Sequence, residues 1–375
     1  MLKSRTLTPG FGVFFDPSKT TSGQRFFAGL CQELNQSAVP FEQRPRVVLF
    51  NISVPWREVV KAKFRGQKIV VRVDGLYFDR LSPDFLASFL PPLRWLFGLG
   101  VRYPQFHNLL AHLANLLDQN YKAFFRILLA DYVIYQSEFS HRVHETYFPN
   151  KPSCVIVNGA RYVNGSNEPA RTTKACIRLV SIYDAWKPAK RVYDVLRFVC
   201  WLNERQQPAT LTVLGYTGTV PEGSPQEMRQ MLEDSSFVST LPRFSTFEGC
   251  FADALVGSDC YITFSYRDPC PNAVVEAMAH GVPVLALTSG GIPDIVSDAG
   301  RLIPTDDFAQ GFFSDHRFGS DFPPIDFEAV STALNDILVN LPMYRQRVAR
   351  RFAEQLDTTV TAKKYLQVLN YLSNS

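Results

Sequence analysis

The sequence predicts an α/β protein with two parallel β-sheets, each covered by helices. Short apolar runs typical of buried strands alternate with longer amphipathic runs typical of helices, which is the pattern of parallel sheets covered on both faces. The length of 375 residues is long for one hydrophobic core and suits two domains. With 46% hydrophobic and 20% charged residues, the composition is that of a globular chain.

Each half of the chain supplies its own strands. In the first half, a loop at residues 20–23 precedes a helix at 24–34, and strands are expected at residues 12–15, 47–50, 68–73, 130–137 and 154–157. A polar stretch at 165–174 reads as the interdomain linker. In the second half, strands are expected at residues 177–182, 210–214, 237–239, 260–264 and 282–287, and the pattern is helical from 331 to 372.

Residues 264–296, FSYRDPCPNAVVEAMAHGVPVLALTSGGIPDIV, carry the most chemical information. Asp268 and Glu276 have seven residues between them, and a proline-rich turn leads into a short helix that contains Glu276. A helix N-terminus is a natural place for a diphosphate, and carboxylates nearby accept hydrogen bonds from sugar or ribose hydroxyls. A buried strand follows and ends at Gly290 and Gly291, where the backbone can approach a ligand closely.

This segment resembles the signature of retaining glycosyltransferases with the GT-B fold, family 4 or glycosyl transferases group 1. That signature has an acidic residue, seven others and Glu, followed by EAMAxGxPV and GGxPE. The resemblance implies two Rossmann-like domains facing a cleft, with a C-terminal helix that crosses back to the first domain. The expected boundaries are residues 1–168 for the acceptor-side domain, 169–345 for the nucleotide-sugar domain and 346–375 for the returning helices.

The resemblance assigns the transferred sugar to Asp268 and the nucleotide ribose to Glu276. Two departures stand out, because Asp268 is one methylene shorter than the usual Glu and a DPCP sequence replaces the family's EGFG. Each proline removes a backbone donor, so sugar recognition through N–H groups is left to Cys270 and Asn272 at most.

A phosphate clamp is expected after the first strand of the second half, in SIYDAWKPAKRVYDVL. Lys190 best matches the family's lysine, and fixed positive charge there would stabilise the leaving diphosphate. The family's arginine has no obvious counterpart, and Lys187, Arg191 and Arg267 are the alternatives.

In the first half, the resemblance places Gly23 in the glycine-containing loop before the first helix, and the VxNG turn recurs at residues 157–159. Asp74 stands at the strand end where many family members carry a histidine that contacts the donor sugar. It would then bind a sugar hydroxyl or stabilise the cationic transition state, and a solvent-facing turn is the alternative.

Other classes of site find little support. The six histidines offer one pair at helical spacing, His141 and His144, without a third ligand, and neither a DxD motif at a strand end nor a P-loop is present, so no metal or cofactor is expected. The net charge of +4 lacks the basic, aromatic-interleaved runs of a nucleic-acid groove. Seven cysteines without a CxxC pair and an N-terminus unlike a signal peptide indicate a cytoplasmic protein.

Residues 85–103, FLASFLPPLRWLFGLGVRY, form the most apolar stretch. Their prolines and Arg94 exclude a simple spanning helix, and their Trp, Tyr and Arg content suits the lipid headgroup region, which would fit a lipid-linked acceptor. Cover for the sheet and a dimer contact are the alternatives. The sequence therefore predicts a retaining, metal-independent glycosyltransferase for a surface polysaccharide or glycolipid, with a non-catalytic homologue and a GT-B epimerase as rivals.

Overall fold

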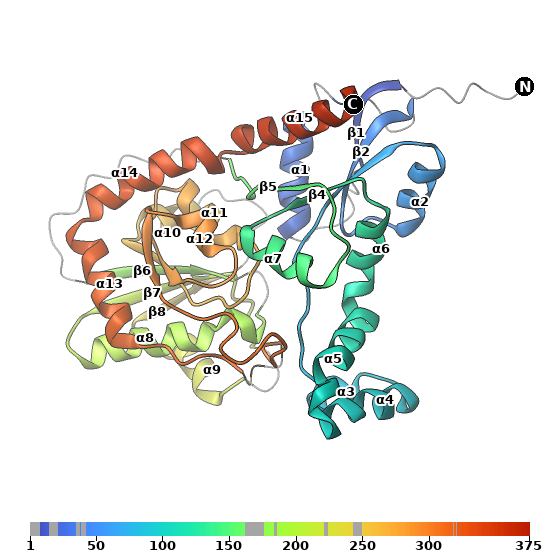
Figure 1. Ribbon diagram of the computed structural model, residues 1–375. Helices are drawn as coiled ribbons and strands as arrows, with labels where there is room; N and C mark the ends of the chain where they lie inside the picture. Colours follow the sequence, from blue (N-terminus) through green and yellow to red (C-terminus); the bar gives the residue numbers. More distant parts are fainter. Residues whose placement is uncertain are drawn as a thin grey trace, which may run out of the picture. The chain divides into compact units, whose positions relative to one another are not determined.

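A computed structural model describes residues 8–14, 22–34, 38, 43–161, 176–183, 186–220, 224–242, 250–317, 319 and 321–375. The chain divides into two compact units (Figure 1). The first consists of Met1–Gly159, Gly311–Asp315 and Thr358–Ser375, and the second of Ala160–Gln310 and His316–Asp357. The expected linker at 165–174 lies outside the described residues, so the boundary at 168 stays a prediction.

A five-stranded parallel sheet organises the first unit, with the strand order β1-β2-β3-β4-β5. Its strands are apolar runs whose alternate side chains enter different cores. Val47 and Leu49 pack with α1 and α15, whereas Val48 and Phe50 pack with α2 and α6. The strands are β1 (Thr8–Phe14), β2 (Pro45–Asn51), β3 (Lys68–Arg72), β4 (Tyr132–Tyr135) and β5 (Ser153–Val155), and the helices are α1 (Ser22–Leu34), α2 (Trp56–Phe64), α6 (Tyr121–Leu129), α7 (Glu138–Tyr147) and α15 (Thr358–Asn374).

Short helices between β3 and β4 form a helical insertion in the first unit. They comprise α3 (Pro83–Ala87), α4 (Pro91–Arg102), the 3-10 turn η2 (Pro104–Phe106), α5 (His107–Asn115) and the π-helical segment η3 (Leu116–Asn120), which continues into α6. A separate core holds the insertion together, and Phe313 from the segment Gly311–Asp315 belongs to it. Within residues 85–103, which were predicted to suit the headgroup region, Phe85 and Phe97 are instead core residues, 0% and 1% exposed.

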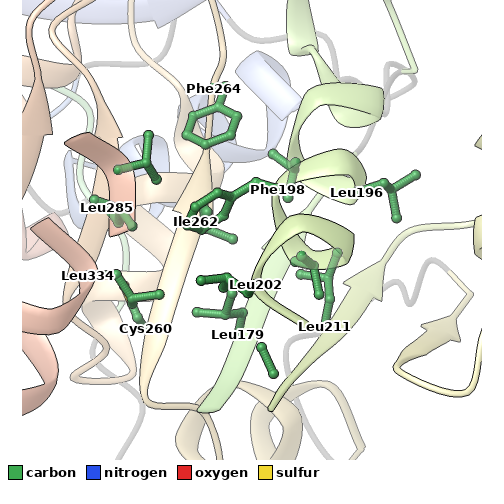
Figure 2. Packing of buried hydrophobic residues seen from close by; sticks show 14 of the residues in the cluster. Leu179, Leu196, Phe198, Leu202, Leu211, Cys260, Ile262, Phe264, Leu285 and Leu334 are labelled. Atoms are coloured by element: carbon green, nitrogen blue, oxygen red, sulfur yellow. The ribbon is translucent and has the colours of Figure 1, made fainter. Parts of the chain in front are cut away.

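The second unit contains a six-stranded parallel sheet in the order β11-β10-β9-β6-β7-β8. Its core packs α8 and α13 on the strands, and Figure 2 shows Phe198 and Leu202 of α8 directed toward Ile262 of β9. The strands are β6 (Ile177–Ile182), β7 (Ala209–Leu214), β8 (Val238–Leu241), β9 (Cys260–Thr263), β10 (Val284–Leu287) and β11 (Gly300–Ile303), and the helices are α8 (Val192–Glu204), α9 (Gln226–Glu233), α10 (Cys250–Val256), α11 (Asn272–Ala279), α12 (Ile292–Val296), α13 (Phe327–Val339) and α14 (Leu341–Arg351).

The C-terminal helix returns to the first unit, as the sequence predicts. After α14 and the π-helical segment η5 (Phe352–Leu356), the chain is extended at Asp357 and then forms α15. Tyr365 and Leu369 of α15 are fully buried against Phe27 and Leu30 of α1. Two parallel Rossmann-like sheets and this crossing helix confirm the predicted fold class. In the part of the chain that the structure describes, no helix is both long and apolar enough to span a bilayer.

Candidate functional site

The topology of the second sheet singles out one position for a ligand. From β6 the chain proceeds outward to β7 and β8, and then returns to place β9, β10 and β11 on the other side. The strand order therefore reverses between β6 and β9, which pair in parallel. In open α/β sheets, ligands bind outside the carboxyl ends of the strands at such a switch point. The loops after Ile182 and Thr263 border this position.

Lys190 and Asp268, one from each of these loops, meet as an ion pair. The Lys190 ammonium donates a hydrogen bond to Oδ2 of Asp268, and the backbone N–H of Cys270 donates to Oδ1 at 3.1 Å. The two side chains are 27% and 18% exposed, so both stay within reach of a ligand. The predicted sugar contact and the predicted phosphate contact thus lie side by side at the switch point.

The two glycines after β10 pack against the backbone of the Asp268 loop. Gly290 has φ +60°, and a Cβ atom added to it would lie 2.1 Å from the backbone oxygen of Asp268. The N–H of Gly291 donates to that same oxygen at 2.8 Å. The N–H of Gly290 donates to Oδ2 of Asp307, also at 2.8 Å. Because both N–H groups are bonded within the protein, the glycines contribute close backbone packing at the site.

Asp307, which the sequence analysis missed, organises this loop from the end of β11. Its carboxylate accepts a hydrogen bond from the Ser289 hydroxyl in addition to the Gly290 N–H. Burial raises the pKa of Asp307, and these two hydrogen bonds and the charge of Arg267 oppose that rise. An acidic pair shortly after a strand, at Asp306 and Asp307, was the available sequence signal.

Arg267, one candidate for the second phosphate cation, anchors the same loop. Its Nε donates to the backbone oxygen of Asp307 at 2.6 Å, and its guanidinium lies 4.8 Å from the Phe308 ring centre. Its backbone has φ 52°, in the left-handed region. Burial lowers the pKa of Arg267, whereas Tyr266 and Asp307 raise it. Arg267 therefore stabilises this loop through contacts within the protein, independently of any contact with a ligand.

Glu276, Asn272 and Cys270 belong to or adjoin α11. Asn272 is the first residue of the helix, Cys270 is buried two residues before it, and Glu276 is one turn further along. The Glu276 side chain is half-buried, and its charge adds to burial and Tyr183 in raising the pKa of Tyr261 in β9. The Glu276 carboxylate is therefore within electrostatic range of β9.

Lys187 and Arg191 line a separate cavity of about 890 Å³ along the outer face of α8. Arg191 donates from Nε to Oδ2 of Asp194 at 2.8 Å, and its guanidinium lies 5.3 Å from the Phe322 ring centre. Arg191 is thus directed along α8, and its role as the second cation stays a prediction. Lys187 stays a prediction.

Asp74 lies at the carboxyl edge of the first sheet in a hydrogen-bonded network. Arg72, fully buried, donates to Asp74 Oδ1 at 2.8 Å and to Asn158 Oδ1 at 2.8 Å. Gln136 also donates to Asp74 Oδ1, at 2.6 Å, and accepts a hydrogen bond from Asn158. With its side chain 43% exposed, Asp74 is an anchored, accessible carboxylate, and its role toward a sugar stays a prediction.

Gly23 was predicted in the loop before the first helix. It is instead the second residue of α1, which begins at Ser22.

The two histidines of α7 have different surroundings. The His141 ring lies 3.1 Å from the Glu145 carboxylate, whereas the His144 ring hydrogen-bonds the backbone oxygen of Ser140 at 2.6 Å. Burial lowers the pKa of His144 to about 4. Within the described ranges, no group of three or more His, Cys, Asp or Glu side chains is placed to hold a metal ion.

A family model matches the region of the chain that contains the switch point. Residues 178–315, which include β6 to β11 and the loops at the switch point, match the family model of glycosyl transferases group 1. This region is therefore similar to that family. No curated protein sequence matches the chain.

Solved structures share the fold over 88% to 96% of this chain. The pneumococcal O-GlcNAc transferase GtfA, bound to UDP and GlcNAc, has 12% identity and a TM-score of 0.53 over 88% of this chain and 57% of its own. Anabaena HepE bound to UDP-glucose has 14% identity and a TM-score of 0.56 over 96% of this chain and 100% of its own. WaaG, involved in lipopolysaccharide biosynthesis, has 12% identity and a TM-score of 0.55 over 96% and 99%. The GT-B fold is therefore confirmed, and the chain spans little more than half of GtfA.

Proposed function

We propose that this chain is a retaining glycosyltransferase that moves a sugar from a nucleotide-sugar donor to a saccharide or lipid-linked saccharide acceptor. The observation that carries the proposal is the pair of Lys190 and Asp268 at the switch point of the second sheet. An ammonium beside a carboxylate provides one group for a diphosphate and one for a sugar hydroxyl. The family match at residues 178–315 supports this assignment.

Each part of the donor then has a partner. The N-terminus of α11 and Lys190 hold the diphosphate, because the positive end of a helix dipole and a positively charged side chain stabilise an anion. Glu276 accepts hydrogen bonds from the ribose, and Asp268 accepts them from the transferred sugar. Cys270 and Asn272 line the start of α11, where the sugar and the diphosphate join.

The transfer itself needs no metal ion in this proposal. The bond between the anomeric carbon and the leaving phosphate breaks, and the acceptor oxygen bonds the same face of that carbon. The acceptor's proton passes to an oxygen of the leaving phosphate, and Lys190 and the α11 N-terminus stabilise the remaining negative charge. Asp74, held by the buried Arg72, is the candidate carboxylate of the first unit for the cationic sugar.

The similar structures support a class of donor and a class of product. HepE was solved with UDP-glucose and GtfA with UDP and GlcNAc, which supports a UDP-sugar donor. WaaG takes part in lipopolysaccharide synthesis, which supports a surface polysaccharide or glycolipid as the product.

A donor panel tests the proposal. The protein is incubated with UDP-, GDP- and ADP-sugars and saccharide acceptors, the released diphosphate is quantified, and the anomeric configuration of the product is read by proton NMR. We expect diphosphate release that depends on an acceptor, insensitivity to a metal chelator and retention of configuration. An inverted product would exclude the retaining assignment. Acceptor-independent release of free sugar would favour an epimerase, and tight binding without turnover a non-catalytic homologue.

A further inference from the structure

Exposed apolar side chains concentrate on the helical insertion of the first unit. Residues 90–128 carry two thirds of the large apolar side chains that are exposed in the described part of the chain. Monomeric soluble proteins rarely expose a contiguous apolar surface of this kind unless it binds something. We call these exposed side chains of α4, η2, α5, η3 and α6 the apolar face.

One row of the apolar face follows a continuous helical run from α5 through η3 to α6. Leu109, Leu113, Leu117, Tyr121 and Phe125 occur at every fourth position and are between 38% and 58% exposed. Four residues advance about 40° beyond a full α-helical turn, so such a row ordinarily winds around the helix. The π-helical segment has more residues per turn, which offsets part of that drift. The run therefore presents these side chains along one side.

The second part of the apolar face comes from α4, which packs against α5. Trp95 is 71% exposed and Val101 is 56% exposed, whereas Phe97 points into the core of the insertion. In Figure 1, α4 and α5 lie at the end of the first unit farthest from α15. Exposed apolar side chains therefore occur on both of these neighbouring helices.

The charges around the apolar face have one predominant sign. Residues 90–129 contain Arg94, Arg102, Lys122 and Arg126 but a single carboxylate, Asp118. Arg126 is buried and donates to the backbone oxygen of Val54. Arg102 and Lys122 lie beside the rings of Tyr103 and Tyr121, each 5.6 Å from the ring centre. Long basic side chains next to interfacial aromatic rings suit a surface of anionic headgroups.

We infer that the apolar face docks the protein on an anionic lipid bilayer, with the helices lying in the headgroup region. A second copy fits less well, because an isologous dimer would bring like basic charges together with few carboxylates to pair them. The inference extends the proposed function, and it rests on that function only in implying that the acceptor is presented at the bilayer.

Vesicle flotation tests the inference without depending on activity. The wild type should float with phosphatidylcholine vesicles that contain phosphatidylglycerol, more weakly with phosphatidylcholine alone, and less in high salt. Leu113→Glu/Leu117→Glu should lower the partition coefficient at least about tenfold, since burying one leucine side chain accounts for a change of that size. Phe64→Glu, at an 89% exposed apolar residue of α2 outside the face, is the matched control.

Each outcome bears on the inference. Loss of flotation in the double variant but not in the Phe64 control supports it. A wild type that stays out of anionic vesicles at low salt overturns it, as does a wild-type dimer that the double variant converts to a monomer without any vesicle binding. Nucleotide binding by the double variant is measured in parallel. If it is retained, the docking result stands apart from the proposed function.

Discussion

Replacing Gly290 by Ala probes the contact that supports the Asp268 loop. The added Cβ would lie 2.1 Å from the Asp268 backbone oxygen and 2.7 Å from its nitrogen. Real Cβ atoms do not approach backbone that closely, so the loop has to move. The shift would also disturb the hydrogen bond from the Gly291 N–H to the Asp268 oxygen, which is 2.8 Å long.

The size of the effect follows from three contributions. An L-residue in the left-handed region costs about 1–2 kcal/mol. Overpacking against rigid neighbours adds about 1–3 kcal/mol. A weakened backbone hydrogen bond adds about 0.5–1.5 kcal/mol. We therefore expect Gly290→Ala to lower the free energy of unfolding by about 3–5 kcal/mol.

Gly281→Ala is the matched control for this measurement. Gly281 has φ +75°, and nothing lies within 4 Å of its added Cβ, so the control isolates the conformational cost. Urea denaturation should show a loss of about 1–2 kcal/mol for the control and a clearly larger loss for Gly290→Ala. Nucleoside diphosphate affinity should fall only in Gly290→Ala. Equal stability losses with unchanged affinity in both variants would refute the packing argument.

Three further predictions concern single side chains. Asp268→Asn should slow transfer about 10- to 100-fold, which corresponds to the loss of one charge-assisted hydrogen bond. Affinity for the bare diphosphate should stay equal or rise, because Lys190 loses its competing carboxylate. Equal losses of affinity for the donor and for the diphosphate would contradict this prediction. Asp74→Asn should slow transfer by a similar factor, about 10- to 100-fold, with unchanged diphosphate affinity, and wild-type turnover would remove it from the site. Burial lowers the pKa of His144 to about 4 in the folded protein, so the unfolded chain takes up a proton on this histidine at a higher pH than the folded protein does. The free energy of unfolding of the wild type should therefore fall by about 2 kcal/mol from pH 7 to pH 5. In urea titrations, the stability of His144→Gln should not show that loss between pH 7 and pH 5. The same pH dependence of stability in the variant and the wild type would contradict this prediction.

Features that depend on local sequence patterns were predictable. Strands such as β2 and β9 are continuous apolar runs between turns, and this is why both parallel sheets were predictable. Lys190 and Asp268 were identified separately through the family resemblance. Their direct pairing depends on how β6 and β9 come together, which only the folded sheet reveals.

Features that depend on distant neighbours were not predictable. Asp307 follows β11, whereas its partners Ser289 and Gly290 follow β10, and no spacing in the sequence connects them. The network around Asp74 joins residues from three separate strand ends. Phe97 and Trp95 are equally apolar in sequence, and only the packing of α4 on α5 buries one and exposes the other.

The central claim is that the switch point of the second sheet binds a nucleoside diphosphate through Glu276 and its neighbours. Calorimetric titration with UDP, GDP and ADP tests it most directly, using the wild type, Glu276→Ala and the control Glu354→Ala at an exposed glutamate of the same unit. We predict that at least one diphosphate binds the wild type and the control alike, and that Glu276→Ala binds it more weakly by about 1.5–3 kcal/mol. A folded Glu276→Ala protein with wild-type affinity, or a wild type that binds none of the three, would contradict the account.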